Sequence, residues 1–351
     1  MITYWQQQNG KLMQKDRSEL AASEPVWVDA RVVTRDDLQM LQADYGIDQD
    51  QLLDILDPDE LSRIELNEEL SYTLIIMRLP VFSPGDDISY FCAPLGIIIK
   101  GNLFITVCWT DCEVLKDFAA NRIRDFSLAD FPAVTIRFLS RSDTMFLRYL
   151  KELNRRATTI QNEMLQSVRN HELIQLLNIQ KSLVYFATAL KSNQLLLEKL
   201  RKTKIISLDQ EDQDWLDDVE IDNRQAMEMA DIYMDIMASM NDAFASVLSN
   251  NLNIVMKTMT GWNLVLMLPT IVTGYFGINV PLPWAASGWV GAIAVLGLCV
   301  MTALVSYFIF MKRNIGGVSV PVRKKSARQR LLERKQCQFL KKQEKRAEAQ
   351  R

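Results

Sequence analysis

The segment 289–311 constrains the fold of this chain most, because its 23 residues include no charged side chain. At about 1.5 Å per residue, a helix of this length can cross a hydrocarbon layer of about 30 Å. We therefore predict a transmembrane helix over 289–311. The alternative is a helix buried on every side inside a soluble protein.

A second, less uniform apolar segment precedes it over about 258–277. This segment contains Asn263, Pro269 and several small residues. Polar groups inside a membrane are costly unless they face protein or water. We expect this helix to face a partner or a pore, while the second span can face lipid.

The charges beside the two spans predict their orientation. Lys257 precedes the first span, Lys312 and Arg313 follow the second, and the connecting loop 278–288 carries no charge. Cationic residues favour the cytoplasmic side. We expect a multi-pass protein of the cytoplasmic (inner) membrane, with both termini in the cytoplasm and the loop outside.

The basic tail 312–351 contrasts with an acidic remainder. The tail has 14 Lys and Arg against 3 Asp and Glu, which is +11, so the formal net charge of −3 leaves −14 elsewhere. Such a tail fits a surface of anionic lipid, and a solvated tail is the alternative. Nucleic acid is not expected as a partner, because the tail's single aromatic residue, Phe339, gives no stacking pattern.

Residues 1–145 read as a cytoplasmic α/β domain. Strands are expected at 25–33, at 71–82 and across 93–109, the last folded into a hairpin at Lys100-Gly101-Asn102. Helices are expected at 34–46, with Thr34 as N-cap, and at 49–56, ended by Pro58.

Helical periodicity dominates the rest of the cytoplasmic part. Apolar residues recur at helical spacing from about 128 to 204, and we expect a helical hairpin region over 146–212. After Trp215 no Gly or Pro occurs until Gly261. This predicts one long helix over 213–277 that includes the first span and needs partners along its length.

A stripe of polar and small residues, here called the stripe, follows this long helix in alternating steps of four and three. Its members are Asp235, Ser239, Asp242, Ser246, Ser249, Asn253, Met256, Thr260, Asn263, Met267, Thr270, Gly274 and Gly277. The spacing is that of a coiled-coil seam, but the seam holds almost no large aliphatic residue. Several copies around one axis would line a water-filled pore whose oxygen atoms hold hydrated cations. Close packing of helices through small residues is the alternative, and Met256 and Met267 suit either a dewetting constriction or core filling.

The stripe ends at Gly277-Ile278-Asn279, before a loop rich in proline. Carbonyl groups lose their helical partners at a helix end, and Asn279 adds an amide oxygen. A ring of such oxygens can bind Mg²⁺ through its retained waters.

Catalytic and tightly bound metal sites are not indicated. Five scattered cysteines and the single His171 form neither a disulfide framework nor a zinc motif. The acidic run 209–222 has no accompanying nucleophile or catalytic histidine, and no phosphate-binding loop occurs. We predict a protein that is not an enzyme and has no organic cofactor.

The sequence "YFGINV" ahead of the second span resembles the signature of the CorA-type two-transmembrane divalent-cation channels, usually Tyr-Gly-Met-Asn. The segments "LLDILDPDELSRIEL" and "SNNLNIVMKTMT" are also similar to that family. The order of the parts matches up to Met311, and the basic tail extends beyond the family's compact ending.

The resemblance implies a funnel-shaped homopentamer with its α/β domains in the cytoplasm. It further implies that Mg²⁺ is both transported and regulatory. Asp54 and Asp218 match two carboxylates that hold Mg²⁺ between neighbouring subunits and keep the pore closed; from the residues alone, Asp217 stays an alternative to Asp218. Asp242 matches an acidic ring at the cytoplasmic end of the pore, and further pore-lining positions are matched by Asn253, Met256, Thr270 and Asn279.

Ile278 departs from the usual methionine, and related proteins with an altered middle residue include ZntB-like zinc transporters. The main expectation is a channel for Mg²⁺, with Co²⁺ or Ni²⁺, that works down the electrochemical gradient. The alternatives are a zinc transporter of the same architecture and a non-conducting, membrane-anchored Mg²⁺ sensor.

Overall fold

A computed structural model describes residues 1–21, 23–124, 126–166, 170–203, 205, 208–278 and 288–315. The chain divides into an N-terminal unit, Met1–Ser246, and a C-terminal unit, Val247–Arg351. Asn279, most of the predicted outer loop and the tail from residue 316 lie outside the described residues.

The N-terminal unit is built on a seven-stranded sheet in the order β2-β1-β3-β7-β6-β5-β4. Its strands are β1 (Ile2–Gln8), β2 (Lys11–Lys15), β3 (Val26–Arg31), β4 (Arg63–Asn67), β5 (Tyr72–Phe82), β6 (Tyr90–Lys100) and β7 (Leu103–Cys108). Only the β3–β7 pair is parallel, and Val26 lies opposite Leu103 in its register. The other neighbouring strands are antiparallel.

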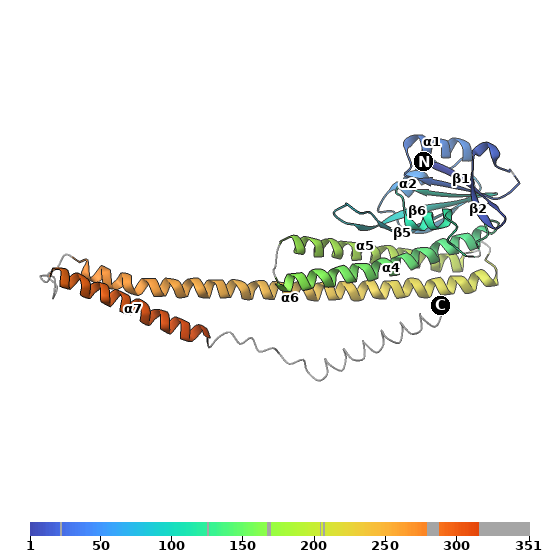
Figure 1. The fold of residues 1–351 in the computed structure, drawn as a ribbon. Coiled ribbons are helices and arrows are strands. Elements are labelled where there is room, and N and C mark those ends of the chain that lie inside the picture. The colour runs from blue at the N-terminus through green and yellow to red at the C-terminus, as the bar shows by residue number, and fades with distance from the viewer. Residues whose placement is uncertain are drawn as a thin grey trace. The chain divides into compact units, whose positions relative to one another are not determined.

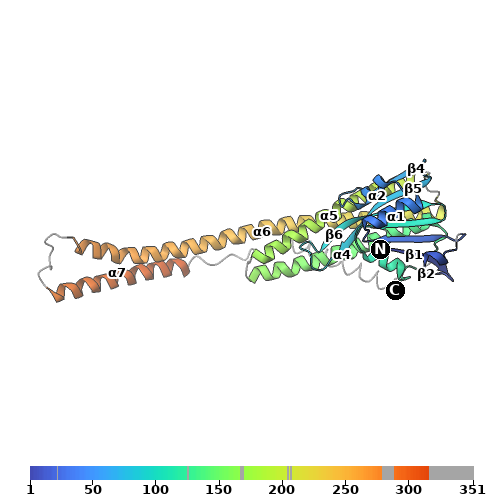
Figure 2. The same cartoon turned by 90° about the horizontal axis from the view of Figure 1, so that it is seen from above.

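Helices cover both faces of this sheet (Figure 1). One face carries α1 (Arg35–Tyr45) and α2 (Gln49–Leu56). The other face carries α3 (Glu113–Ala119), α4 (Phe131–Gln166), α5 (Asn170–Lys202) and the first part of α6 (Gln210–Phe276). A short 3₁₀ helix, Arg17–Glu19, follows β2. Two views show α4, α5 and α6 side by side (Figures 1 and 2).

Side chains on β5 alternate between the two cores. Leu74 and Ile76 face α1 and α2, while Ile75 and Met77 face the longer helices. All four are fully buried. Burial on both faces requires the run of apolar residues that the sequence has here.

Local signals account for the predicted elements that are confirmed. Thr34 forms a capping box with Asp37, and Gly46 ends α1 in the left-handed conformation at φ 61°. Gly101 takes φ 55° in the turn between β6 and β7, where glycine lacks the steric penalty of a side chain. These observations confirm the helix at 34–46 and the hairpin at 100–102.

The hairpin formed by β1 and β2 is not among the predicted strands. Asn9 and Gly10 both have positive φ, 50° and 77°, as a two-residue hairpin turn requires. The apolar periodicity predicted a helix from about residue 128, whereas α4 begins three residues later, at Phe131.

The C-terminal unit contains the last part of α6 and α7 (Trp289–Ile315). Both helices are long and apolar enough to cross a membrane, and their most apolar stretches have mean hydropathies of 1.2 and 2.4. Only 11% and 6% of those stretches are buried. The large apolar surface left by this folding needs lipid or further protein to cover it.

Candidate ion pathway and regulatory site

Contacts between α6 and α7 define one face of the first membrane helix. A Cβ atom on Gly261 would lie 1.8 Å from the Phe310 ring, so glycine is what permits this close approach. Val265 is buried on the same face, and the Cys299 thiol lies 3.9 Å from the Pro269 carbonyl oxygen. The two helices run antiparallel here, because ascending positions on α6 meet descending positions on α7.

The stripe lies on the other side of α6. With about 100° of rotation per residue, Asn263, Met267 and Thr270 point roughly 170° away from the face that contacts α7. All members of the stripe are exposed in the single chain, including Met256 and Met267, at 64% and 57%. From Ser249 to Gly274 the stripe therefore forms a face of α6 that α7 leaves uncovered.

Two hydroxyl groups on the stripe direct their protons inward. Ser246 Oγ donates to the Asp242 carbonyl at 3.0 Å, and Thr270 Oγ1 donates to the Leu266 carbonyl at 2.9 Å. With the proton used in this way, each oxygen still has lone pairs facing away from the helix. Such oxygens suit a cation or the waters around it.

The C-terminal end of α6 carries the last two glycines of the stripe, Gly274 within the helix and Gly277 just after it. A Cβ atom on Gly274 would meet open space, whereas one on Gly277 would lie 3.1 Å from the Thr273 carbonyl oxygen. The Gly277 amide donates to that carbonyl at 2.9 Å and closes the last turn. Ile278 is 51% exposed, and Asn279 lies beyond the described part of this segment.

Asp54 is presented by α2, which two buried residues anchor to the sheet. Leu52 and Ile55 are almost wholly buried, and Ile55 fills the space that a side chain on Gly96 would need. The Asp54 side chain lies on the other face of α2 and is 48% exposed. Its Oδ2 accepts a hydrogen bond from Arg63 Nη2 at 2.7 Å.

Asp218 is presented by α6 in a similar way. Leu216 and Val219 are buried in the core, and Asp218 is exposed. Asp217 is paired with Arg201 of the same chain, and among the described residues no ion pair involves Asp218. This arrangement favours Asp218 over Asp217 as the carboxylate available to an external cation.

The structure brings two further acidic residues toward Asp218. Burial raises the pKa of Asp222, and the negative charge of Asp218 adds to the effect. Asp143 on α4 is 2% exposed, and burial, followed by the charge of Asp222, raises its pKa well above the ordinary value. Neither residue was predicted as part of a site. Asp143 is an acidic residue within the apolar periodicity of α4, and Asp222 ends the acidic run 209–222.

Asp54 and Asp218 are not brought together within one chain. They belong to the helical layers on opposite faces of the sheet. Among the described residues of one chain, no group of three His, Cys, Asp or Glu side chains could hold a metal ion. The two carboxylates do supply oxygen donors, the type of ligand that Mg²⁺ prefers.

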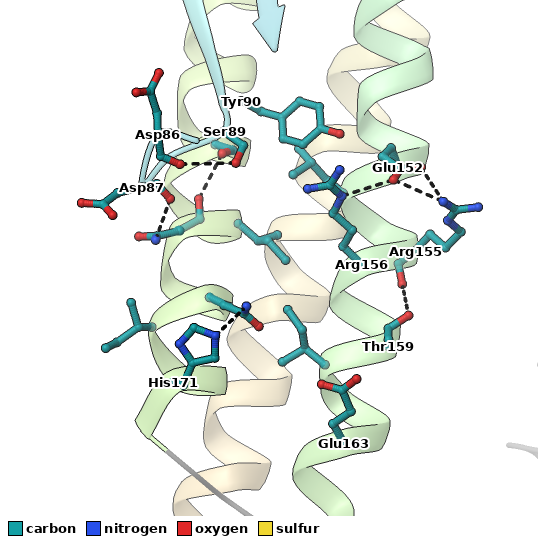
Figure 3. Close-up of a pocket in the computed structure, with 17 residues that line it drawn as sticks. Asp86, Asp87, Ser89, Tyr90, Glu152, Arg155, Arg156, Thr159, Glu163 and His171 are labelled. Atoms are coloured by element: carbon teal, nitrogen blue, oxygen red, sulfur yellow. Dashed lines mark hydrogen bonds and ion pairs between the residues drawn. The ribbon is translucent and has the colours of Figure 1, made fainter. Parts of the chain in front are cut away.

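A separate pocket of about 940 Å³ lies between α4 and α5, beside the turn that joins β5 and β6 (Figure 3). Arg155 and Arg156 both pair with Glu152, which lowers the pKa of that carboxyl group. His171 contacts Gln175 at 3.0 Å. The basic side chains of this pocket thus have partners within it, and none belongs to the stripe.

Comparisons with known proteins match nearly the whole chain. The family model of the CorA-like Mg²⁺ transporter protein matches residues 22–313. The cobalt/magnesium transport protein CorA of Methanocaldococcus jannaschii is 25% identical over 291 residues, which cover 82% of this chain and 90% of that protein.

Solved structures share the fold. The complete CorA magnesium transporter of M. jannaschii matches with a TM-score of 0.71 at 23% identity, over 89% of this chain and 97% of that one. The ZntB cytoplasmic domain of Vibrio parahaemolyticus matches with a TM-score of 0.55 at 10% identity, over 71% of this chain and 98% of that one. Since the family model spans most of the sequence, this chain belongs to the CorA-like Mg²⁺ transporter family, a family of transporters and not of enzymes.

Proposed function

We propose that this protein is a homopentameric channel that moves Mg²⁺, and also Co²⁺ or Ni²⁺, across the cytoplasmic membrane. The observation that carries this proposal is the uncovered stripe on α6, on the side away from α7. Five copies around an axis would place oxygen atoms at repeated levels along a pore. A membrane potential of about −100 mV favours entry of a divalent cation by about 4.6 kcal/mol, so no ATP is required.

In this proposal Gly277, Ile278 and Asn279 form the selective outer mouth, and Asp242 forms an acidic ring at the cytoplasmic end. Cytoplasmic Mg²⁺ bound between Asp54 of one subunit and Asp218 of its neighbour holds the pore closed. The placement of these residues in different layers of one chain supports a site shared between subunits. Emptying the site leaves like charges facing each other, which favours opening.

Membrane topology and the tail complete the proposal. Both termini lie in the cytoplasm, because Lys257 precedes the first span, Lys312 follows the second, and cationic residues beside a span favour the cytoplasmic side. The basic tail lies against anionic lipid, to which each cation near the surface adds about 1 kcal/mol.

Zinc transport is the second candidate. The similarity to the ZntB cytoplasmic domain and the isoleucine at position 278 favour it. Against it, the stripe contains neither histidine nor cysteine, and oxygen ligands favour Mg²⁺ over softer ions. A hydrated ion needs no direct ligand, so flux measurements must decide.

The test is uptake of Mg²⁺ and Zn²⁺, measured side by side in liposomes that contain the purified full chain. We expect Mg²⁺ uptake that is lost in Asn279→Ala and kept in Asn251→Ala, the same change on α6 away from the stripe. Normal uptake by Asn279→Ala would refute the selective mouth. Zinc uptake alone would select the second candidate, and no uptake of either ion would favour a sensor.

A further inference from the structure

The guanidinium group of Arg63 sits among three carboxylates. Its Nη2 donates to Asp54 Oδ2 at 2.7 Å, Nη1 contacts Glu60, and Nε lies 2.9 Å from Glu65 Oε1. The Arg63 side chain is only 20% exposed, and a guanidinium stays charged at any physiological pH. Three negative charges and one positive charge leave a formal charge of −2 at this place.

We propose that Arg63 is a tethered cation that competes with the regulatory divalent ion for Asp54 and so raises the Mg²⁺ concentration at which the site fills. This inference rests on the proposed function, because that proposal makes Asp54 a regulatory ligand. Nothing in the family resemblance assigned a role to Arg63.

The competition follows from geometry and charge. The hydrogen bond to Arg63 engages Oδ2, while the half-exposed Asp54 side chain still reaches solvent. An ion that binds the exposed part of this carboxylate approaches a positive charge a few ångströms away. Like charges at this distance repel, and the repulsion doubles for a divalent ion. The same arginine partly neutralises Asp54 when the ion has left.

Arg63 is held in place by the rest of the structure. Glu60 is only 19% exposed, and its backbone carbonyl accepts a hydrogen bond from Arg78 Nη1 at 2.6 Å. The Arg78 amide in turn donates to the Asn193 side chain on α5 at 2.9 Å. Because the backbone of Glu60 is anchored in this way and the Arg63 side chain is itself mostly buried, Arg63 has little room to turn away from an arriving ion.

The test measures how much Mg²⁺ protects the detergent-solubilised full chain from limited proteolysis. The midpoint is the Mg²⁺ concentration that gives half-maximal protection. In Arg63→Gln, which keeps hydrogen-bond donors but loses the charge, we expect this midpoint to fall roughly tenfold. Arg63→Lys keeps the charge, and its midpoint should stay within about twofold of that of the unmodified protein. Arg155→Gln removes an arginine from an exposed ion pair on α4 and should leave the midpoint unchanged.

A double variant shows whether Arg63 acts through Asp54 or through the neighbouring Glu60 and Glu65. If Arg63 acts through Asp54, the Arg63→Gln shift should disappear when Asp54→Asn is already present. A shift that persists there would mean that the ion binds Glu60 or Glu65, and it would overturn the proposal. An unchanged or higher midpoint in Arg63→Gln, with the helical circular dichroism preserved, would also overturn it.

Uptake by the same preparations keeps this inference distinct from the proposed function. Unmodified protein that conducts Mg²⁺ and closes as Mg²⁺ rises, together with an unshifted Arg63→Gln midpoint, would refute only the role of Arg63. Absence of any Mg²⁺-dependent protection in the unmodified protein would refute the regulatory site and this inference with it.

Discussion

The two units of this chain bury their apolar residues in opposite ways. In the N-terminal unit, Phe138 is 1% exposed and lies among other rings, at 3.8 Å between centroids from Phe118 and 6.2 Å from Trp27. In the C-terminal unit, Phe308 is 67% exposed and Leu296 is 69% exposed. The first unit encloses its own core, whereas the second presents its apolar side chains to the outside.

This contrast shows which solvent each part is made for. Water drives the N-terminal unit to form a core on each face of the sheet. Lipid gives α6 and α7 no such drive, so close contacts such as Gly261 with Phe310 must hold the helices together. The part of the stripe from Ser249 onward is the exception in the C-terminal unit, because it is uncovered and most of its side chains are polar or small.

The largest expected effect is the loss of a core ring. Phe138→Ala should destabilise the N-terminal unit by about 3–5 kcal/mol, because it removes a large buried side chain and leaves a cavity. Thermal unfolding of the full chain in detergent, followed by near-ultraviolet circular dichroism, would measure it. Phe308→Ala is the matched control and should change the midpoint little. Equal losses in the two variants would contradict the contrast between the units.

A smaller effect is expected at the contact between α6 and α7. Gly261→Ala forces a methyl group into the Phe310 ring and should cost about 1–3 kcal/mol, as overpacking does. Gly297→Ala is the control, because a Cβ atom there meets no atom within 4 Å and alanine favours a helix. Adding Phe310→Ala should relieve Gly261→Ala. Failure of that rescue would place the clash elsewhere.

The smallest effect concerns Asp143 and depends on pH. Its folded pKa is raised, first by burial and then by Asp222. The charged form therefore costs stability, and that cost grows as pH rises above the ordinary value of 3.8. Asp143→Asn should raise the melting temperature by roughly a few degrees at pH 8 and by less at pH 5, with EDTA present. A variant that melts lower at pH 8 would indicate a stabilising partner for the carboxylate.

Local patterns predicted much of the fold. Thr34 begins one helix as its N-cap, and Gly46 ends it in the left-handed conformation. Both signals were readable from the sequence because they depend on single residues. The hairpin at Asn9 and Gly10, which was not predicted, carries an equally local signal, because Asn-Gly is a preferred two-residue hairpin turn. The parallel pairing of β3 with β7 could not be predicted, since about seventy residues separate the partners and no local rule selects them.

The candidate site divides in the same way. The stripe could be predicted from the sequence, because residues spaced three or four apart lie on the same face of a helix with 3.6 residues per turn. The sequence also determined the two apolar spans, whereas Asp54 and Asp218 became candidates only through the resemblance to the CorA-type family. Only the tertiary structure placed α7 on the opposite side of α6, brought Asp143 to Asp222, and set Arg63 among three carboxylates. These contacts join residues from different elements, and packing of the whole fold decides which elements meet.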